Sequence, residues 1–349
     1  MARFTFVDLF AGIGGMRLGL EGAGGRCVMA SEISAHSRRT YRANFGEEPL
    51  GDIRRIRAGD VPDHDVLAAG FPCQPFSAAG VSKRRSMGVP DGLADGDQGR
   101  LFFEILRIVR KKRPPALLLE NVRGLAFHAG GSTLGGMLGA LRGLGYATRH
   151  AVVGSSALVP QRRERLFVAA FHGAADFGFP DLGGPGPALG GILSQGVAPR
   201  YTLADGTWAA LRRHASRSRR RGSGFGHTVA DPRGPSRTLC ARYHKDGAEI
   251  LVAQGGGKNP RRLTPRECVL LMGFPAGFRL PVSDTRAYMQ LGNAAVPPVV
   301  ARIAAAMAAA LWPRGRGARA GAPAAVHGGH PGAWGLSGGR LLGHPPRLA

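Results

Sequence analysis

The chain has 349 residues, 44% of them hydrophobic, which suits one large domain plus a smaller one and supplies enough apolar side chains for a core. Lys and Arg total 47 against 23 acidic residues, and a formal charge of +24 favours a polyanionic partner, nucleic acid ahead of a membrane surface. No uncharged apolar run reaches roughly 18 residues and Met1 opens directly into ARFTFVDLF, so neither secretion nor membrane insertion is expected.

Short apolar runs alternate with helical patterns through the first half of the chain. They are FTFVDLF (4–10), CVMASE (27–32), DVLAAG (65–70), LFFEILRIVRKK (101–112), PALLLEN (115–121), LGGMLGALRGLGY (134–146) and RLFVAAF (165–171). Strands alternating with helices predict a largely parallel sheet that is covered on both faces. We therefore expect an α/β domain over residues 1–175.

The pattern changes after Phe171. Residues 176–191 read as a linker of Gly and Pro, and a second module is expected over 176–258. Order returns over 259–312, which includes a good helix after Pro298. Residues 313–349 are Gly, Ala, Pro and Arg without periodicity, and a disordered tail is expected there.

A strand, a glycine turn and a helix are expected at the amino-terminal end. Gly12, Gly14 and Gly15 would let the backbone approach a ligand, but Arg17 stands where the dinucleotide fingerprint needs a glycine. Glu32 and Asp52 are expected at the ends of the second and third strands, where an acid can bind ribose hydroxyls. Two acids beside the turn suit a cofactor with an adenosine and no phosphate, S-adenosylmethionine; the alternative is a purely structural glycine bend.

The four cysteines stand at positions 27, 73, 240 and 268, and none forms a CxxC pair, so neither a metal site nor a disulfide framework is indicated. Cys27 is interpreted as a small buried hydrophobe. Cys73 differs because GFPCQPFS follows an apolar run of strand length and places it among prolines, on a loop at the carboxyl end of a strand. Such loops carry the chemistry of open α/β sheets, which makes Cys73 a candidate nucleophile.

Basic residues are clustered. The clusters are KRR (83–85), RKKR (110–113), RRHASRSRRR (212–221) and RR (261–262). Any one of them alone is better interpreted as a solvated face, but together they favour contact with nucleic acid.

Six segments occur in a fixed order: FVDLFAGIGG, GFPCQPFS, LLLENV, QRRERLFV, RRLTPREC and QLGNAAVPP. This order resembles that of bacterial DNA cytosine-C5 methyltransferases over about residues 3 to 311, and AGVSKRRSMG and RTLCARYHKDGAEILV are similar to the Dcm-like branch. The resemblance implies a Rossmann-like S-adenosylmethionine-dependent methyltransferase fold with a smaller, irregular target-recognition domain.

The resemblance also implies roles for individual residues. Phe10 would stack on the adenine, Glu32 would hold the ribose, Asp52 and Ile53 would meet the adenine edge, and Asn293 would help to close the pocket. The implied cofactor-binding residues are Phe10, Ala11, Gly12, Ile13, Gly14, Gly15, Glu32, Ile33, Asp52, Ile53, Pro72 and Asn293. The implied catalytic residues are Cys73 as nucleophile, Glu120 as acid, and Arg163 and Arg165 as anchors of the base and loop.

Carbon 5 of cytosine is too electron-poor to accept a methyl group directly, so a thiolate must first attack carbon 6. Nearby arginines would raise the thiolate fraction of Cys73. Glu120 would hold a proton for the ring nitrogen, which requires a pKa raised by burial. The alternative for Glu120 is a strand-end acid that caps a helix.

The target base must leave the duplex, so a mobile basic flap is expected after Cys73. The residues expected to contact DNA are Gln74, Ser77, Lys83 and Arg84 in this flap and Arg237, Thr238 and Leu239 in the second module. Members of the Dcm-like branch modify the inner cytosine of CCWGG or CCNGG, and a site of that kind is expected here.

Two departures from the family pattern are visible. QLGNAAVPP has Ala294 where the family usually has serine, which removes a hydroxyl near the methionine end of the cofactor. Ala79 replaces a serine that some relatives use to hold the flipped base.

Three other functions were weighed: a DNA-binding regulator without turnover, an RNA cytosine methyltransferase and a dehydrogenase. Cys73, Glu120 and Arg165 argue against the first, the recognition module against the second, and the missing glycine against the third. The expected setting is a bacterial cytoplasm, with a monomer acting on double-stranded DNA of the nucleoid and a cognate restriction endonuclease acting separately.

Overall fold

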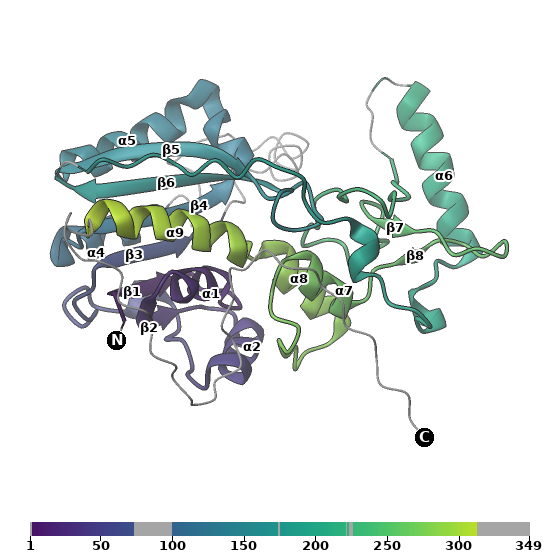
Figure 1. The fold of residues 1–349 in the computed structure, drawn as a ribbon, viewed down its shortest axis with the longest axis horizontal. Helices are drawn as coiled ribbons and strands as arrows, with labels where there is room; N and C mark the ends of the chain where they lie inside the picture. The colour runs from purple at the N-terminus through teal and green to yellow at the C-terminus, as the bar shows by residue number, and fades with distance from the viewer. Residues whose placement is uncertain (1, 73–99, 174, 221, 223–225, 313–349) are drawn as a thin grey trace, which may run out of the picture.

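The computed structural model describes residues 2–72, 100–173, 175–220, 222 and 226–312. They form two lobes, one built on a large sheet and the other on loops, short strands and a long helix (Figure 1). The expected tail at 313–349 lies outside the described residues, as do Cys73, Gln74, Ser77, Lys83 and Arg84.

The large sheet has six strands in the order β2-β1-β3-β4-β6-β5. Its strands are β1 (Phe4–Leu9), β2 (Gly25–Ser31), β3 (Val66–Gly70), β4 (Ala116–Val122), β5 (Tyr146–Gly154) and β6 (Glu164–His172). Strands β1 to β4 are parallel neighbours, as the alternating pattern predicted, whereas β6 runs antiparallel to both β4 and β5. The carboxyl ends of β1, β2, β3 and β4 therefore meet at one edge of the sheet, which faces the second lobe (Figure 1).

The helices and the smaller strands complete the two lobes. The α-helices are α1 (Gly15–Gly22), α2 (Ala35–Phe45), α4 (Arg100–Lys112), α5 (Ser132–Gly143), α6 (Asp205–Arg220), α7 (Pro265–Leu271), α8 (Asp284–Asn293) and α9 (Pro297–Leu311). The short 3-10 helices are η1 (Ile53–Arg55), η2 (Arg123–Ala126), η3 (His128–Gly131), η4 (Leu189–Ile192) and η5 (Pro199–Tyr201). Strands β7 (Leu251–Val252) and β8 (Arg261–Arg262) pair in the second lobe.

The sheet separates two hydrophobic cores, because successive side chains of a strand point to opposite faces. On β1, Phe4 and Phe6 join the core formed with α1 and α9, whereas Val7 and Leu9 join the core formed with α4 and α5. Both faces of the sheet are thus covered, as expected for a sheet whose strands are continuous apolar runs.

The second lobe shares a core with the first. Leu239, Tyr243 and Ile250 are fully buried and belong to the same cluster as Phe6 on β1. The division of the chain at 176 and 258 stays a prediction.

The chain from Asp284 to Leu311 is long and apolar enough to cross a membrane by composition, but 56% of its most apolar window is buried inside the protein. It consists of two helices, α8 and α9, and a break at residues 294–296 separates them. The buried side chains of α9 include Val300 and Ile303, which belong to the core shared with α1. Its apolar character is therefore that of a core helix.

One expectation about the chain path is wrong. Asp52 was expected at the end of the third strand, but the third strand is β3 and Asp52 instead caps η1. Its side chain accepts from the backbone N–H of Arg54 at 3.1 Å and pairs with the Arg54 guanidinium at 2.6 Å. An Asp side chain often accepts from a backbone N–H at the start of a helix or turn. In the sequence, such an Asp cannot be distinguished from an acid at the end of a strand.

Candidate active site at the carboxyl ends of the strands

The turn after β1 is held in a backbone conformation that favours glycine. Gly12 and Gly14 have φ values of 56° and 87°, and Phe10 has a φ of 56°. The Ala11 N–H donates to the carbonyl of Ser31 at 2.9 Å, which fixes the turn against β2. A Cβ added at Gly12 would meet nothing within 4 Å, because this glycine faces open space. The turn thus presents bare backbone to a ligand.

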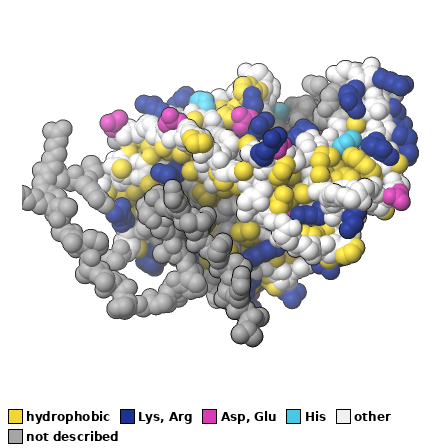
Figure 2. All heavy atoms as spheres, turned by 45° about the vertical axis from the view of Figure 1, so that its right-hand side comes forward, with side chains coloured by type: hydrophobic (Ala, Val, Ile, Leu, Met, Phe, Trp, Pro, Cys, Tyr) yellow, Lys and Arg dark blue, Asp and Glu magenta, His cyan; other side chains and the backbone are white. Residues whose placement is uncertain are grey.

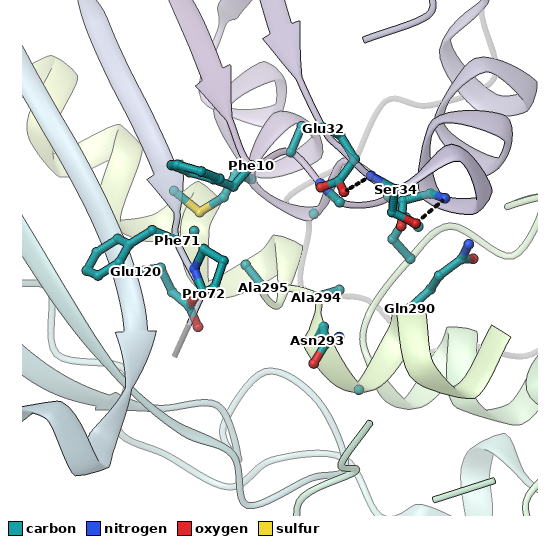
Figure 3. Close-up of a pocket in the computed structure, with 18 of the residues that line it drawn as sticks. Phe10, Glu32, Ser34, Phe71, Pro72, Glu120, Gln290, Asn293, Ala294 and Ala295 are labelled. Atoms are coloured by element: carbon teal, nitrogen blue, oxygen red, sulfur yellow. Dashed lines mark hydrogen bonds between the residues drawn. The ribbon is translucent and has the colours of Figure 1, made fainter. Parts of the chain in front are cut away.

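Glu32 follows β2 directly and fastens the turn from the other side. Its Oε2 accepts from the Gly12 N–H at 2.9 Å and its Oε1 accepts from the Ser34 N–H at 2.7 Å. Figure 3 shows the Glu32 carboxylate beside Ser34 at the rim of the pocket. Each carboxylate oxygen has a second lone pair, so Glu32 can still accept from hydroxyl groups of a ligand.

Glu120 lies near the end of β4, next to Gly70 on β3. The side chain is almost fully buried, and burial raises the pKa of its carboxyl, while the positive charges of Arg165 and Arg163 partly oppose that shift. Oε1 lies 3.2 Å from Nε of Arg165, but no described residue meets the geometry of a hydrogen bond to this oxygen. Glu120 therefore combines a tendency to hold a proton with unused hydrogen-bonding capacity.

These groups surround one cavity of about 410 Å³. Its wall draws on the ends of β1, β2, β3 and β4, the first turn of α2, and the segment from α8 to α9. Figure 3 shows Phe10, Pro72 and Glu120 on one side and Ser34 and Gln290 on the other, with Ala294 and Ala295 between them. The predicted site residues that line it are Phe10, Ala11, Gly12, Ile13, Gly15, Glu32, Ile33, Pro72, Glu120, Arg165 and Asn293.

Several predicted residues lie elsewhere. Asp52 and Ile53 are not among the lining residues. Gly14 does not line the cavity either, and its place is structural, since an added Cβ would lie 2.3 Å from the Phe45 ring. Ile53 is buried in the core that holds α4.

Arg163 is buried and faces backbone carbonyls. Its Nη1 donates to the carbonyl of Leu239 at 3.0 Å, and its Nη2 donates to the carbonyls of Gly292 and Ala294 at 2.9 and 2.8 Å. A guanidinium suits this task because its donors have a fixed fork geometry. Arg163 directly precedes β6, and it thus connects this strand to the second lobe through Leu239 and to the end of α8 and the segment after it through Gly292 and Ala294.

The residues predicted to read DNA differ in exposure. Arg237 is exposed and donates to the hydroxyl of Thr228 at 3.0 Å. Thr238 donates from its hydroxyl to the carbonyl of Arg162 at 2.6 Å. Leu239 is fully buried, and its N–H donates to the side chain of Gln161 at 2.7 Å. A buried side chain cannot reach a base edge, so the structure leaves Arg237 as the surface group of this segment.

Two polar residues of the site were not singled out from the sequence. Asn121 is buried and its Nδ2 donates to the carbonyl of Phe71 at 3.1 Å, which connects the ends of β4 and β3. Its position directly after Glu120 was the feature of the sequence that could have identified Asn121 as a residue of the site. Gln290 lines the cavity from α8, and in the sequence it resembles any polar residue of a helix.

The sequence model of the family described as C-5 cytosine-specific DNA methylase matches residues 4–309. The Type II methyltransferase M.NlaX of Neisseria lactamica is 45% identical over 314 residues, covering 88% of this chain and 97% of that protein. The Type II methyltransferase M.DsaV of Dactylococcopsis salina is 44% identical over 311 residues, covering 87% and 86%. A DNA-cytosine methyltransferase of Escherichia coli is 42% identical over 361 residues, covering 86% and 76%.

Solved structures show the same architecture. The Dnmt2 methyltransferase of S. pombe superposes with a TM-score of 0.69 at 19% identity, covering 89% of this chain and 98% of that one. The methyltransferase EhMeth of Entamoeba histolytica gives a TM-score of 0.68 at 17% identity, with the same two coverages. At these identities the likeness concerns the fold alone.

Proposed function

The chain belongs to the C-5 cytosine-specific DNA methylases, and from this premise we propose that it methylates cytosine in a short duplex site through a covalent adduct of Cys73. It is a DNA cytosine-5 methyltransferase of the type II kind and uses S-adenosylmethionine. The adduct, the roles of single residues and the DNA site are parts of the proposal.

The residues of the pocket fit the cofactor. The Gly12 backbone is open to the cavity, Glu32 keeps lone pairs for ribose hydroxyls, and Phe10 offers a ring at the same wall. When bound, the cofactor supplies the methyl group. Asp52 and Ile53 are not needed for this fit, since neither lines the cavity.

The chemistry assigned to the chain begins with the Cys73 thiolate, which forms a bond to carbon 6 of a flipped cytosine. Electron density moves from the ring double bond toward the ring nitrogen, and Glu120 donates its proton to that nitrogen. Carbon 5 then becomes nucleophilic enough to accept the methyl group. A base then removes the proton from carbon 5, the sulfur to carbon 6 bond breaks, the ring nitrogen returns its proton to Glu120, and the thiolate is released. Arg165, at 3.2 Å from Glu120, would hold that carboxyl and the base in register.

One observation carries the proposal: Glu120, a buried carboxyl whose pKa is raised, lies near the end of β4, in the same cavity as Pro72. Pro72 directly precedes Cys73 in the sequence. A carboxyl that caps a helix accepts from a backbone N–H, whereas Oε1 of Glu120 has no hydrogen-bond partner among the described residues, so the interpretation of Glu120 as a structural cap is disfavoured.

The target site is proposed to be of the CCWGG or CCNGG kind, with modification at the inner cytosine. The support is the likeness of RTLCARYHKDGAEILV to the Dcm-like branch and the exposed position of Arg237. An arginine can contact guanine through two hydrogen bonds, which discriminates by about 1–3 kcal/mol. The proposed setting is a bacterial cytoplasm, with the protein as a monomer and a cognate endonuclease acting separately. The type II names of two relatives favour the restriction-modification part of this setting.

The covalent step is tested with a duplex that carries 5-fluorocytosine at the target. Fluorine cannot leave as a proton does, so the wild-type protein should remain bonded to the DNA through denaturing electrophoresis. Cys73→Ser should form no such adduct while it keeps its affinity for S-adenosylhomocysteine, and Cys27→Ser is the matched control that should still be trapped. Equal trapping of Cys73→Ser would place the nucleophile elsewhere.

A further inference from the structure

Arg237 lies in a segment of the second lobe whose backbone is fastened to the first lobe. Before it, the Ser236 N–H donates to the carbonyl of Pro160 at 2.9 Å, and the Arg162 N–H donates back to the carbonyl of Ser236 at 2.9 Å. After it, the Thr238 hydroxyl donates to the carbonyl of Arg162 at 2.6 Å. The chain on both sides of Arg237 is thus bonded to the segment between β5 and β6, so the backbone of Arg237 has a fixed place relative to the large sheet.

The guanidinium of Arg237 is held from a different part of the second lobe. Its Nη1 donates to the hydroxyl oxygen of Thr228 at 3.0 Å, although the Arg237 side chain is exposed. The hydroxyl is uncharged, so this bond orients the guanidinium without neutralising it. A long exposed side chain otherwise samples many rotamers, and ordering it on binding is unfavourable. Arg237 is therefore ordered at its backbone and at its charged end before any ligand binds.

Thr228 is itself fixed beside β7, which Figure 1 shows in the second lobe. Its N–H donates to the carbonyl of Ala248 at 2.8 Å, and its carbonyl accepts from the N–H of Leu251, the first residue of β7, at 2.8 Å. Leu251 is fully buried, so Thr228 moves only if these backbone bonds break. Threonine is also branched at Cβ, which restricts its χ1 rotamers. The hydroxyl of Thr228 is thus a fixed acceptor.

The bond to Thr228 leaves one edge of the guanidinium free. A guanidinium has five N–H donors in one plane, and the bond to Thr228 uses one of the two on Nη1. Within the part of the chain that the structure describes, neither Nε nor Nη2 of Arg237 forms a hydrogen bond. The N–H groups of Nε and Nη2 on this edge are parallel, which suits the O6 and N7 acceptors of guanine in the major groove.

We propose that Thr228 is a positioning residue for the choice of DNA site: its hydroxyl holds the Arg237 guanidinium in the orientation in which the free edge meets guanine. The inference rests on the proposed contact between Arg237 and guanine, and it adds the residue that orients this contact. A guanidinium held at Nη1 does not turn to a phosphate or to another base when an acceptor of the guanine is missing, so its donors stay unpaired at a wrong site. A released guanidinium turns to another acceptor, which lowers the penalty for the wrong site.

The test measures kcat/KM of methyl transfer on duplexes with the site that bisulfite sequencing shows the wild-type protein to methylate. Each guanine of that site is replaced in turn by 7-deazaguanine, which still pairs with cytosine and lacks only the N7 acceptor. At the guanine that Arg237 contacts, the wild type should prefer guanine by about tenfold or more, and Arg237→Ala should lower this ratio to about one. Thr228→Val keeps the shape of the side chain and should lower the ratio by about threefold to tenfold, as expected for one lost hydrogen bond, whereas Thr228→Ser should stay within about twofold of the wild type.

Two further variants separate positioning from a purely structural role. Adding Thr228→Val to Arg237→Ala should leave the ratio unchanged, because Thr228 acts through Arg237. Thr148→Val is the matched control, since Thr148 accepts from Nε of Arg142 at 3.1 Å in the first lobe. This control loses the same kind of bond elsewhere and should keep the wild-type ratio; an equal fall for Thr148→Val would show that the ratio reports a loosened fold and would overturn the inference.

The outcomes distinguish this inference from the proposed function. If the wild-type protein methylates no cytosine, the proposed function fails. If Arg237→Ala keeps the wild-type ratio at every guanine, the proposed contact of Arg237 fails and this inference with it. If Arg237→Ala lowers the ratio but Thr228→Val does not, or if Thr228→Val lowers it equally with and without Arg237, the positioning role alone is overturned. Thr228→Ala removes the same hydroxyl and replaces Thr228→Val in every comparison if the valine variant fails to fold.

Discussion

Two buried acids near the site differ in what surrounds them. Glu120 faces the cavity and has Arg165 at 3.2 Å, so a ligand and a cation can both reach it. Asp8 is fully buried on β1 behind the glycine turn, and neither of its oxygens has a hydrogen-bond partner among the described residues. Burial raises the pKa of both carboxyls, but only Glu120 can use its proton on a substrate.

We expect Glu120→Gln to change the pH profile of methyl transfer. In the wild-type protein, kcat/KM should fall as pH rises through the raised pKa of Glu120, because the ionised carboxylate cannot donate to the ring nitrogen. Glutamine still donates a hydrogen bond but does not titrate, so kcat/KM should drop by about 100-fold or more and this alkaline limb should flatten. Initial rates on a duplex substrate from neutral to alkaline pH measure both effects.

The exposed acid Glu164 gives the control. Glu164→Gln changes a neighbouring carboxyl that pairs with Arg123 and should leave the profile as in the wild type. An alkaline limb that persists in Glu120→Gln would assign the titration to another group.

Asp8→Asn should alter how stability depends on pH. Burial raises the pKa of Asp8 to about 8, against about 3.9 in an unfolded chain. Between these values the folded state binds a proton that the unfolded state has released, so the free energy of unfolding should decrease as pH rises from about 4 to about 8. Asparagine cannot ionise, and urea titrations at several pH values should show a flatter dependence for the variant.

Asp63 provides a matched substitution, because its side chain is 95% exposed. Asp63→Asn should keep the slope of the wild type. Parallel slopes for Asp8→Asn and the wild type would mean that Asp8 is not neutral in the folded protein.

At the scale of elements, the contact between α1 and α9 depends on small residues. A Cβ added at Gly19 would lie 2.4 Å from Cβ of Val300, and one added at Gly15 would lie 2.5 Å from the carbonyl oxygen of Ala295. At Gly22 the nearest atom would be Cβ of Ala301 at 3.7 Å, an ordinary contact. Gly19 therefore packs tightly against Val300 of α9, and Gly15 packs against Ala295 in the segment before α9, whereas Gly22 leaves room for a methyl group.

Gly19→Ala should destabilise the protein although alanine favours helices. Overpacking of this kind costs about 1–3 kcal/mol, more than the roughly 1 kcal/mol that a helix gains when alanine replaces glycine. Gly22→Ala carries the same propensity gain without the clash and should be neutral or stabilising. Denaturant titrations that give the free energy of unfolding of both variants test this prediction. A higher free energy of unfolding for Gly19→Ala than for the wild type would show that α9 shifts without an energetic cost.

The elements that the sequence predicted are those with an unambiguous burial pattern. Strands β1, β3 and β4 are buried on both faces, and their continuous apolar runs are visible in the sequence. Strand β5, YATRHAVVG, alternates between buried and exposed positions and was not identified as a strand. Helix α6 was missed because only Ala215 and Ser218 are buried on it, so no apolar period marks it.

The site shows the same limit. Glu32 and Glu120 could be placed because Glu32 directly follows β2 and Glu120 directly follows the apolar run ALLL within β4. Arg163 and Arg165 are two residues apart and equivalent in the sequence, yet Arg163 turns to carbonyls of Leu239, Gly292 and Ala294 while Arg165 reaches the cavity. Contacts between residues 76 to 131 positions apart decide this difference, and no local pattern encodes them.

For the whole molecule, the distribution of charge bears on how DNA is held. Figure 2 shows Lys and Arg side chains gathered along the outer part of the second lobe. On α6, the exposed basic residues are Arg212, Arg213, Arg217, Arg219 and Arg220. Arginines on an exposed helix face suit contact with phosphates, which adds affinity without reading sequence.

Replacing Arg217, Arg219 and Arg220 with glutamine should weaken binding to all DNA sequences alike. Each lost phosphate contact reduces the slope of log K against log salt by about 0.9, so three lost contacts reduce it by up to about 2.7. Binding titrations at several salt concentrations measure the slope, and bisulfite sequencing of methylated plasmid should show the same cytosines modified.

The control removes charge at the opposite end of the molecule. Arg110 and Lys111 are exposed in the last turn of α4, far from α6 in Figure 1, and replacing them with glutamine should leave the slope unchanged. A triple α6 variant with an unchanged slope, or with altered target sites, would contradict the role given to this helix.

The pairing of α1 with α9 also bears on how the protein is made. A ribosome adds about 5–20 residues per second. The apolar face formed by Ile13, Met16 and Leu20 therefore stays exposed on the order of tens of seconds before α9, which covers it, has been synthesised. The parallel strands are synthesised early, yet one of their two cores cannot close until residue 311 has emerged. We therefore expect chaperones to bind the exposed apolar face of α1 in nascent chains. A chain terminated anywhere before α9 should be degraded by proteases and should not accumulate as a less active enzyme.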